Sequence, residues 1–98
     1  MSADIIWLAR AEKHLQSIFD YISADSPGTA EAYVEEIVDA CARLQIFPLS
    51  GRRYTNRFRV LVVRNHLVFY SNDEIGNRVI ITAIIDGRRD IEAALGDD

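Results

Sequence analysis

The positions of apolar residues repeat with two different periods along this chain. Across residues 9–22 they recur every three or four positions, which predicts an amphipathic helix. A second stretch of the same kind follows a short break, where Ser26 provides an N-cap and Pro27 the first helical residue. Pro48 and Gly51 mark its end. The short break predicts that the two helices form an antiparallel hairpin.

Four other stretches are rich in Val, Ile, Phe and Tyr, as β-strands are. They cover residues 4–8, 57–63, 66–71 and 78–85. A tight turn in which Asn65 takes a positive φ should join the second and third strands, and a looser turn the third and fourth. The last strand is apolar on both faces, which predicts an interior position. Residues 90–95 are expected to form a closing helical turn.

These elements predict one α+β domain over residues 1–98. Its order is β-α-α-β-β-β, with the helix hairpin packed on one face of a small, curved antiparallel sheet. The single cysteine, Cys41, excludes an internal disulfide and a cysteine-based zinc site. We expect a cytoplasmic protein that does not enter membranes, because we find neither a signal peptide nor an apolar run of the ~20 residues that span a bilayer.

Positive charge is concentrated in the later part of the chain. Residues 1–50 contain three Lys or Arg against eight Asp or Glu, a net charge of −5. Residues 51–90 contain eight Arg against four acids, a net charge of +4. The overall charge of −4 argues against specific binding to nucleic acid. Arginines without intervening acids instead suit recognition of phosphates or of carboxylates on a partner.

Arginines from both ends of the β-rich region are expected to come together. Arg59 alternates with apolar neighbours and should face away from them, and Arg57 should share its face. Because antiparallel strands place the start of one beside the end of the next, we expect this pair to meet Arg88 and Arg89. For Arg89, a structural ion pair and a functional contact both remain open.

Few side chains in the sequence are suited to moving protons. His66 begins a predicted strand beside the arginines and is a better candidate than His14. Tyr70 shares a sheet face with His66 and could donate a proton or stack on a base; alternatively, it lies at the core edge with its hydroxyl in water. We find no metal-ligand spacing, phosphate loop or nucleophile motif, and we predict neither a metal site nor a cofactor.

An ordered set of short motifs resembles the ParE branch of the RelE/ParE toxin superfamily. The motifs are A-x-x-x-L-x-x-I-x-x-Y-I at 11–22, P-x-x-G-R at 48–52, HLVFY at 66–70 and G-x-R-D at 87–90. The resemblance covers nearly the whole chain. It implies a type II toxin of the RelE/ParE-like fold, held inactive by an antitoxin from the same operon.

ParE-like members of the superfamily are described as acting on DNA gyrase. The leading hypothesis from the resemblance is therefore a bacterial toxin that inhibits gyrase by binding, with no reaction to catalyse. Its target-binding residues would be Arg59, Arg89, Arg57, Arg52 and Tyr70.

The resemblance also leaves two alternatives. RelE-like members cleave mRNA in the ribosome, and here Arg59 and Arg89 would stabilise the phosphate while Tyr70 or His66 moves protons. The other alternative is an attenuated homologue that acts as an interaction module. The residues that motivate it stand where the family often has Tyr, Arg and His, and they are His66, Ser71 and Asp86.

A ParD-like antitoxin is the expected partner, forming a hetero-oligomer with the toxin. The helix hairpin and the sheet should leave an apolar groove for an antitoxin helix, and a sheet edge should accept an antitoxin strand. The residues expected to contact the antitoxin are Leu15, Phe19, Tyr33 and Arg59.

Overall fold

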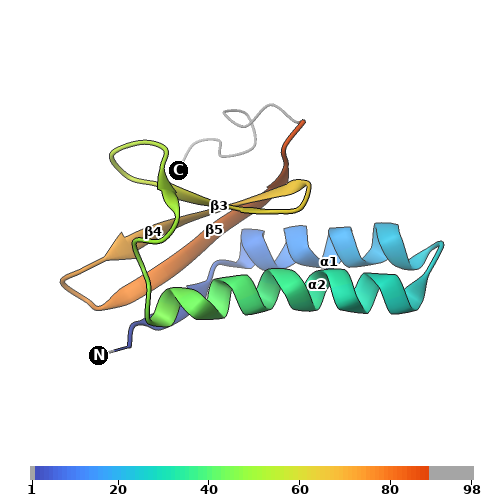
Figure 1. Cartoon of the computed structure of the whole chain (residues 1–98), viewed down its shortest axis with the longest axis horizontal. Helices are drawn as coiled ribbons and strands as arrows, with labels where there is room; N and C mark the ends of the chain where they lie inside the picture. The colour runs from blue at the N-terminus through green and yellow to red at the C-terminus, as the bar shows by residue number, and fades with distance from the viewer. Residues whose placement is uncertain (1, 89–98) are drawn as a thin grey trace.

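A computed structural model describes residues 2–88, which form a helical layer packed against a sheet (Figure 1). The helical layer consists of α1 (Ala9–Ser23), α2 (Pro27–Ala42) and the short 3-10 helix η1 (Arg43–Gln45). The sheet contains β1 (Asp4–Trp7), β2 (Arg52–Arg53), β3 (Arg59–Val63), β4 (His66–Asp73) and β5 (Arg78–Asp86). The helical turn predicted at 90–95 lies outside the described residues.

The strands follow the order β1-β5-β4-β3-β2 across the sheet. Strands β3, β4 and β5 form the predicted antiparallel meander, and β2 adds to β3. The first strand, β1, runs parallel to β5, so the sheet is mixed rather than wholly antiparallel. The predicted α+β fold class is confirmed. The two-residue strand β2 was not expected, because so short a strand shows no apolar period.

Both faces of the sheet are apolar, but only one is covered by the helices (Figure 1). Ile37 of α2 and Leu44 of η1 pack with Val68, Tyr70 and Ile81 of the sheet in the main core. A smaller cluster on the opposite face consists of Phe58, Val60, Phe69, Ala83 and Ile85. Strand β5 contributes to both clusters, which confirms its predicted interior position.

The turn between β3 and β4 differs from the prediction in one residue. Arg64, with φ of 54°, adopts the left-handed conformation that was expected of Asn65. Such a backbone is uncommon for arginine. The Arg64 side chain reaches α2, where its Nε lies 2.9 Å from Oε1 of Glu36 and its guanidinium lies 5.9 Å from the Tyr33 ring centroid. These contacts help to offset the strain of the turn.

Candidate functional site

Two side chains from the sheet hold the loop of residues 46–51, which joins η1 to β2. Tyr70 is completely buried; its hydroxyl donates to the Pro48 carbonyl at 2.8 Å and accepts from the Gly51 amide at 2.9 Å. Arg59 lies opposite Tyr70 in the β3–β4 register. Its Nη1 donates to the carbonyls of Gly51 at 2.8 Å and Leu49 at 3.2 Å. Four hydrogen bonds therefore fix the backbone of this loop.

The alternative that the Tyr70 hydroxyl lies in water is wrong, because both of its hydrogen bonds are made within the chain. Burial raises the pKa of Tyr70, although the Gly51 amide and the Arg59 charge act in the opposite direction. The loop also packs closely on the ring: a Cβ at Gly51 would lie 2.6 Å from Tyr70 Cε1. In this conformation Tyr70 positions the loop rather than presenting a surface.

The structure brings several predicted arginines into one region beside this loop. Arg53, Arg57 and Arg59 line a shallow hollow of about 260 Å³, with Glu74 on its border. Arg57 does not share a strand face with Arg59 as predicted, because β3 begins only at Arg59. The Arg57 guanidinium instead lies 5.3 Å from the centroid of the Phe58 ring.

Arg88 lies at the opposite end of the sheet from Arg59, so the predicted meeting of these arginines is wrong. Arg59 pairs with Tyr70 in the middle of β4, whereas β5 ends at Asp86, which pairs with His66 at the start of β4. The expectation failed because β3 and β5 are not neighbours. They run in the same direction on either side of β4, so their starts lie at the same level. Arg89 lies outside the described residues.

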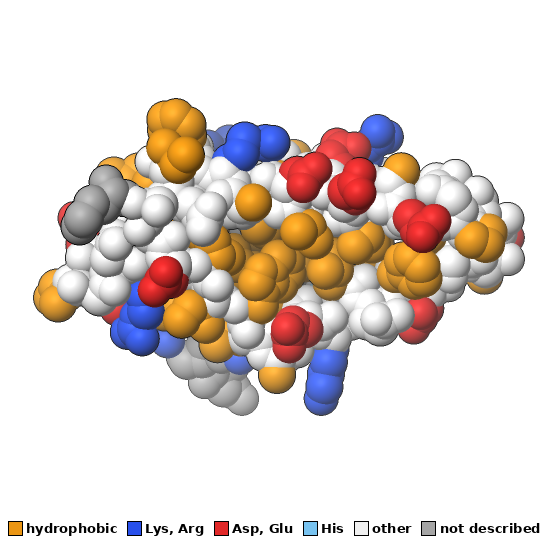
Figure 2. All heavy atoms as spheres, turned by 90° about the horizontal axis from the view of Figure 1, so that it is seen from below, with side chains coloured by type: hydrophobic (Ala, Val, Ile, Leu, Met, Phe, Trp, Pro, Cys, Tyr) orange, Lys and Arg blue, Asp and Glu red, His pale blue; other side chains and the backbone are white. Residues whose placement is uncertain are grey.

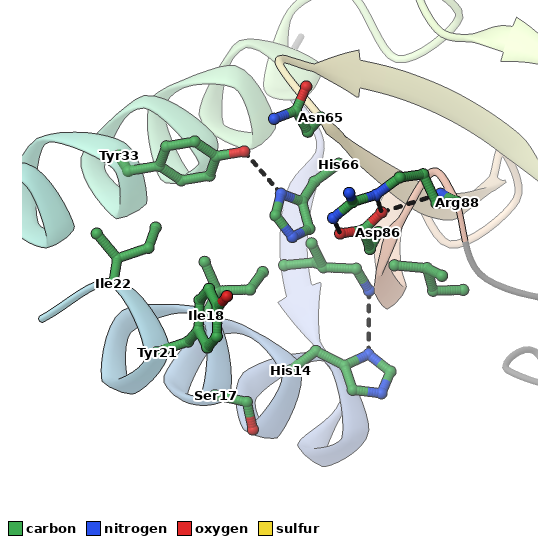
Figure 3. Close-up of a pocket in the computed structure, with 12 residues that line it drawn as sticks. His14, Ser17, Ile18, Tyr21, Ile22, Tyr33, Asn65, His66, Asp86 and Arg88 are labelled. Carbon is green, nitrogen blue, oxygen red and sulfur yellow. Dashed lines mark hydrogen bonds and ion pairs between the residues drawn. The ribbon is translucent and has the colours of Figure 1, made fainter. Parts of the chain in front are cut away.

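His66 lines a second, larger hollow of about 550 Å³ between α1 and the adjacent ends of β4 and β5 (Figure 3). Its Nδ1 lies 2.7 Å from the hydroxyl of Tyr33, and the two rings meet edge to face at 5.5 Å. Asp86 and Arg88 border the same hollow as an ion pair of 3.0 Å. Ile18 of α1 contributes to its apolar wall.

The charges in this hollow are set by their surroundings. Burial lowers the pKa of His66 below its ordinary 6.5; Asp86 acts in the opposite direction, and Arg88 adds to the decrease. A neutral imidazole with its proton on Nε2 accepts a hydrogen bond from the Tyr33 hydroxyl at Nδ1. Hydrogen bonds from the Arg88 side chain and amide hold the pKa of Asp86 well below its usual range. A neutral histidine therefore faces an ionised carboxylate.

His14 and Cys41 have structural surroundings. Nδ1 of His14 accepts the Ile84 amide at 3.1 Å, which ties α1 to β5. Cys41 is buried, and its burial raises the pKa of the thiol to about 12. Across residues 2–88, no three His, Cys, Asp or Glu side chains are placed to hold a metal ion together. No helix in this part of the chain is long and apolar enough to cross a membrane.

The outer face of the helix hairpin carries an apolar groove, with acidic side chains along both borders (Figure 2). Leu15 and Phe19 line it from α1, and Val34 and Val38 from α2. Two of the residues predicted to contact an antitoxin thus lie in one groove, although the groove is on the hairpin surface rather than between hairpin and sheet. Tyr33 lies elsewhere, against His66.

Two features of these sites were not predicted from the sequence. The first is the Tyr33–His66 contact, which joins residues 33 positions apart and has no local signal. The second is the exposure of Ile46, Phe47 and Leu49 on the fixed loop. The proline and glycine of this segment indicated where the helix ends but not that the apolar residues between them face solvent.

Comparison with known proteins places the chain among toxins of toxin–antitoxin systems. A model of the family described as ParE toxin of type II toxin-antitoxin system, parDE, matches residues 5–91. A search of curated protein sequences finds no significant match.

Solved structures show the same fold at low sequence identity. A chain of the chromosomal ParDE system of P. aeruginosa is 22% identical, with a TM-score of 0.74; the alignment covers 87% of this chain and 96% of that one. A chain of the RelBE2 complex of Mycobacterium tuberculosis is 14% identical, with a TM-score of 0.66 and coverages of 88% and 99%. A chain of the archaeal RelE–RelB complex of Pyrococcus horikoshii is 14% identical, with a TM-score of 0.65 and coverages of 92% and 100%. Because the family model spans most of its residues, the chain belongs to the ParE toxin family of type II toxin–antitoxin systems.

Proposed function

We propose that this ParE-type toxin inhibits bacterial DNA gyrase by binding it in the cytoplasm and that a ParD-like antitoxin neutralises it. The proposal rests first on membership of the ParE family. Binding needs no proton transfer, only a fixed surface of suitable charge and shape. The arginine-bearing region around the 46–51 loop supplies such a surface: exposed Arg52 and Arg57 are its proposed target contacts, and Arg59 holds the loop backbone in place.

The observation that favours binding over RNA cleavage is the position of the Tyr70 hydroxyl. Both of its hydrogen bonds are satisfied by Pro48 and Gly51, and no part of the side chain is exposed. His66 lies four strand positions away, about 13 Å at the usual rise per residue. A general acid or base must come within hydrogen-bonding reach of the reacting group. Tyr70 does not meet this condition, and His66 is separated by the same four strand positions from Arg59, which pairs with Tyr70.

Gyrase supercoiling assays with the purified toxin test the proposal directly. We expect loss of supercoiling or accumulation of cleaved DNA complexes, and relief when the antitoxin is added. Unchanged gyrase activity at a large molar excess of toxin contradicts gyrase as the target. Primer extension on mRNA from an in vitro translation reaction tests the ribonuclease alternative, which predicts new cleavage sites. Normal growth after induction without antitoxin would indicate an attenuated homologue.

The groove on the helix hairpin is the proposed docking site for an antitoxin helix. Its floor is apolar and its borders are acidic (Figure 2), so it suits an amphipathic helix with basic residues beside its apolar face. A separate acidic antitoxin segment could cover Arg57 and Arg59. The antitoxin helix would thus meet acidic side chains of the toxin at the hairpin groove, and the acidic segment would meet its arginines.

Substitutions in the groove test this assignment. Leu15→Ser together with Phe19→Ser should weaken antitoxin binding at least ten-fold in calorimetry, because two apolar anchors are lost. The control Ile75→Ser removes a fully exposed apolar side chain from the β4–β5 turn, and the melting temperature of the double variant is measured as well because Leu15 also packs against the core. Equal antitoxin affinity for the double variant and the control would show that the helix binds elsewhere.

A further inference from the structure

The loop of residues 46–51 presents an unusual apolar surface. Ile46, Phe47 and Leu49 are 68%, 62% and 55% exposed, and they lie within four consecutive residues. Isolated apolar side chains are common on protein surfaces, whereas contiguous ones usually mark an interaction site. These three form the densest run of exposed large apolar residues in the part of the chain that the structure describes.

The loop that carries this surface is held rigid from beneath. Tyr70 and Arg59 bind the backbone at Pro48, Leu49 and Gly51 through four hydrogen bonds. The Ser50 amide also donates to the Phe47 carbonyl at 3.1 Å, which closes a turn. A loop that is already ordered loses little conformational entropy when it binds. Burying a tyrosine and engaging an arginine to fix a solvent-exposed loop is consistent with a binding role for the loop.

The charge around the loop indicates the chemistry of its partner. From residue 43 to residue 53 the chain contains three arginines, Arg43, Arg52 and Arg53, and no acid. All three are exposed, and none forms an ion pair with a residue that the structure describes. A partner that covers this surface should therefore offer an apolar pocket bordered by carboxylates.

We infer that the 46–51 loop is the surface with which the toxin contacts its protein target, inserting Phe47 and Leu49 into an acid-rimmed apolar pocket. The inference rests on the proposed function, in which the toxin acts by binding a protein. It assigns the apolar contacts to this loop and the charged contacts to Arg52 and Arg53. Arg59 and Tyr70 then act as positioning residues behind the binding surface.

A fixed loop with three apolar side chains suits a protein pocket better than a lipid surface. Membrane-surface segments are typically amphipathic helices with a long apolar face. Here the apolar residues occupy one turn, and the adjacent helical layer is acidic, with a net charge of −5 over residues 1–50. A single turn offers lipid no such long apolar face.

The test compares Phe47→Ser/Leu49→Ser with the control Ile75→Ser. The control also replaces an exposed apolar side chain by serine, but on the turn between β4 and β5. Both variants should fold as the wild type does, because only exposed side chains are replaced. We expect the double variant to require at least ten-fold more protein to inhibit purified gyrase holoenzyme and to arrest growth less. Its affinity for the antitoxin and its melting temperature should be unchanged. Arg52→Glu/Arg53→Glu should cause a similar loss and reduce the salt dependence of inhibition.

Other outcomes would contradict the role of the 46–51 loop in target binding. Wild-type inhibition and growth arrest by Phe47→Ser/Leu49→Ser would overturn the inference. The inference would also be overturned if the wild-type toxin bound anionic phospholipid vesicles and this variant did not, while the variant still inhibited gyrase as the wild type does. Loss of self-association in sedimentation, again with unaffected inhibition, would assign the loop to a second copy of the chain. If wild-type toxin leaves gyrase active, the proposed function fails, and the growth-arrest comparison alone decides whether the loop contacts another target.

Discussion

The helix-covered face of β4 carries two polar side chains, His66 at the start of the strand and Tyr70 in its middle, that are used in different ways. At the closed end of this face, Tyr70 is buried and makes both of its hydrogen bonds to the 46–51 loop. At the other end, His66 makes one contact with Tyr33 and borders an open hollow of about 550 Å³ (Figure 3). Both residues face the helical layer. Their different roles follow from what packs above them, a loop in one case and a gap beside α1 in the other.

This difference shows that a polar residue on a strand cannot be assigned to function by its type alone. Tyr70 was a candidate proton donor, yet its hydroxyl is an internal tether for a loop. His66 remains accessible from its hollow, and its ring has a neighbouring carboxylate in Asp86. Substitutions at the closed end, around Tyr70, should therefore reduce stability the most. The open end, around His66, should respond more to pH.

Gly51→Ala should produce the largest loss of stability. The new Cβ would lie 2.6 Å from both Cε1 and Oη of Tyr70, and the loop must shift to relieve the overlap. We expect the free energy of unfolding in urea to fall by about 3 kcal/mol. The matched control is Gly28→Ala in the first turn of α2, where nothing lies within 4 Å, and it should stabilise by roughly 0.5 kcal/mol. Similar stabilities of the two variants would contradict the close packing at the closed end.

Tyr70→Phe and Tyr33→Phe compare the closed and open ends of the helix-covered face directly. The first change removes two hydrogen bonds and leaves the buried Gly51 amide without its partner, so it should cost about 2 kcal/mol. The second removes one half-buried bond beside the open hollow and should cost about 0.5 kcal/mol. Denaturant unfolding of both variants measures the difference. A larger loss for Tyr33→Phe would reverse the comparison.

Arg59→Met tests whether an arginine at the closed end is structural. It keeps an unbranched apolar stem but removes the donors to Leu49 and Gly51, and we expect a loss of about 1 to 2 kcal/mol. Arg64→Met removes an exposed ion pair with Glu36 and a contact with the Tyr33 ring, and it should cost about 0.5 kcal/mol. If the two losses are equal in urea unfolding, Arg59 does not hold the loop.

Acidification should affect the open end through His66. Its pKa is lowered in the folded state, so below its ordinary value of 6.5 the unfolded chain binds more protons than the folded one. The free energy of unfolding should therefore decrease as the pH falls from 8 to 5.5. His66→Gln should show a shallower decrease over this range, while Asp86 and Arg88 remain charged in both proteins. Parallel pH profiles would show that His66 does not titrate as we infer.

The sequence pattern predicted the elements of the fold more successfully than their neighbours in space. Both helices, the three long strands and the first short strand were expected within a few residues, because each has a clear apolar period. The parallel pairing of β1 was not expected, since strand order depends on contacts between distant segments. The misplaced Arg88 has the same origin: its chain position says nothing about whether β3 and β5 are adjacent.

For the candidate site residues, the structure gives surroundings that the sequence did not predict. The 46–51 loop is bound by Arg59 and Tyr70, and His66 contacts Tyr33. One groove is lined by both Leu15 and Phe19. That Arg59 and Tyr70 bind backbone carbonyls of the 46–51 loop depends on loop geometry, which has no periodic signal.

Two properties of this toxin were determined by sequence alone: the approximate positions of its two helices and longer strands, and the separation of acidic and arginine-rich halves. Apolar period and charge are local properties of the chain, so they can be read residue by residue. Only the tertiary structure decided which groups are buried, which are tethered and which face solvent. These depend on packing between residues far apart in the chain, as Tyr70 with Pro48 and His66 with Tyr33 show. The same packing leaves Phe47 and Leu49 exposed on a rigid loop.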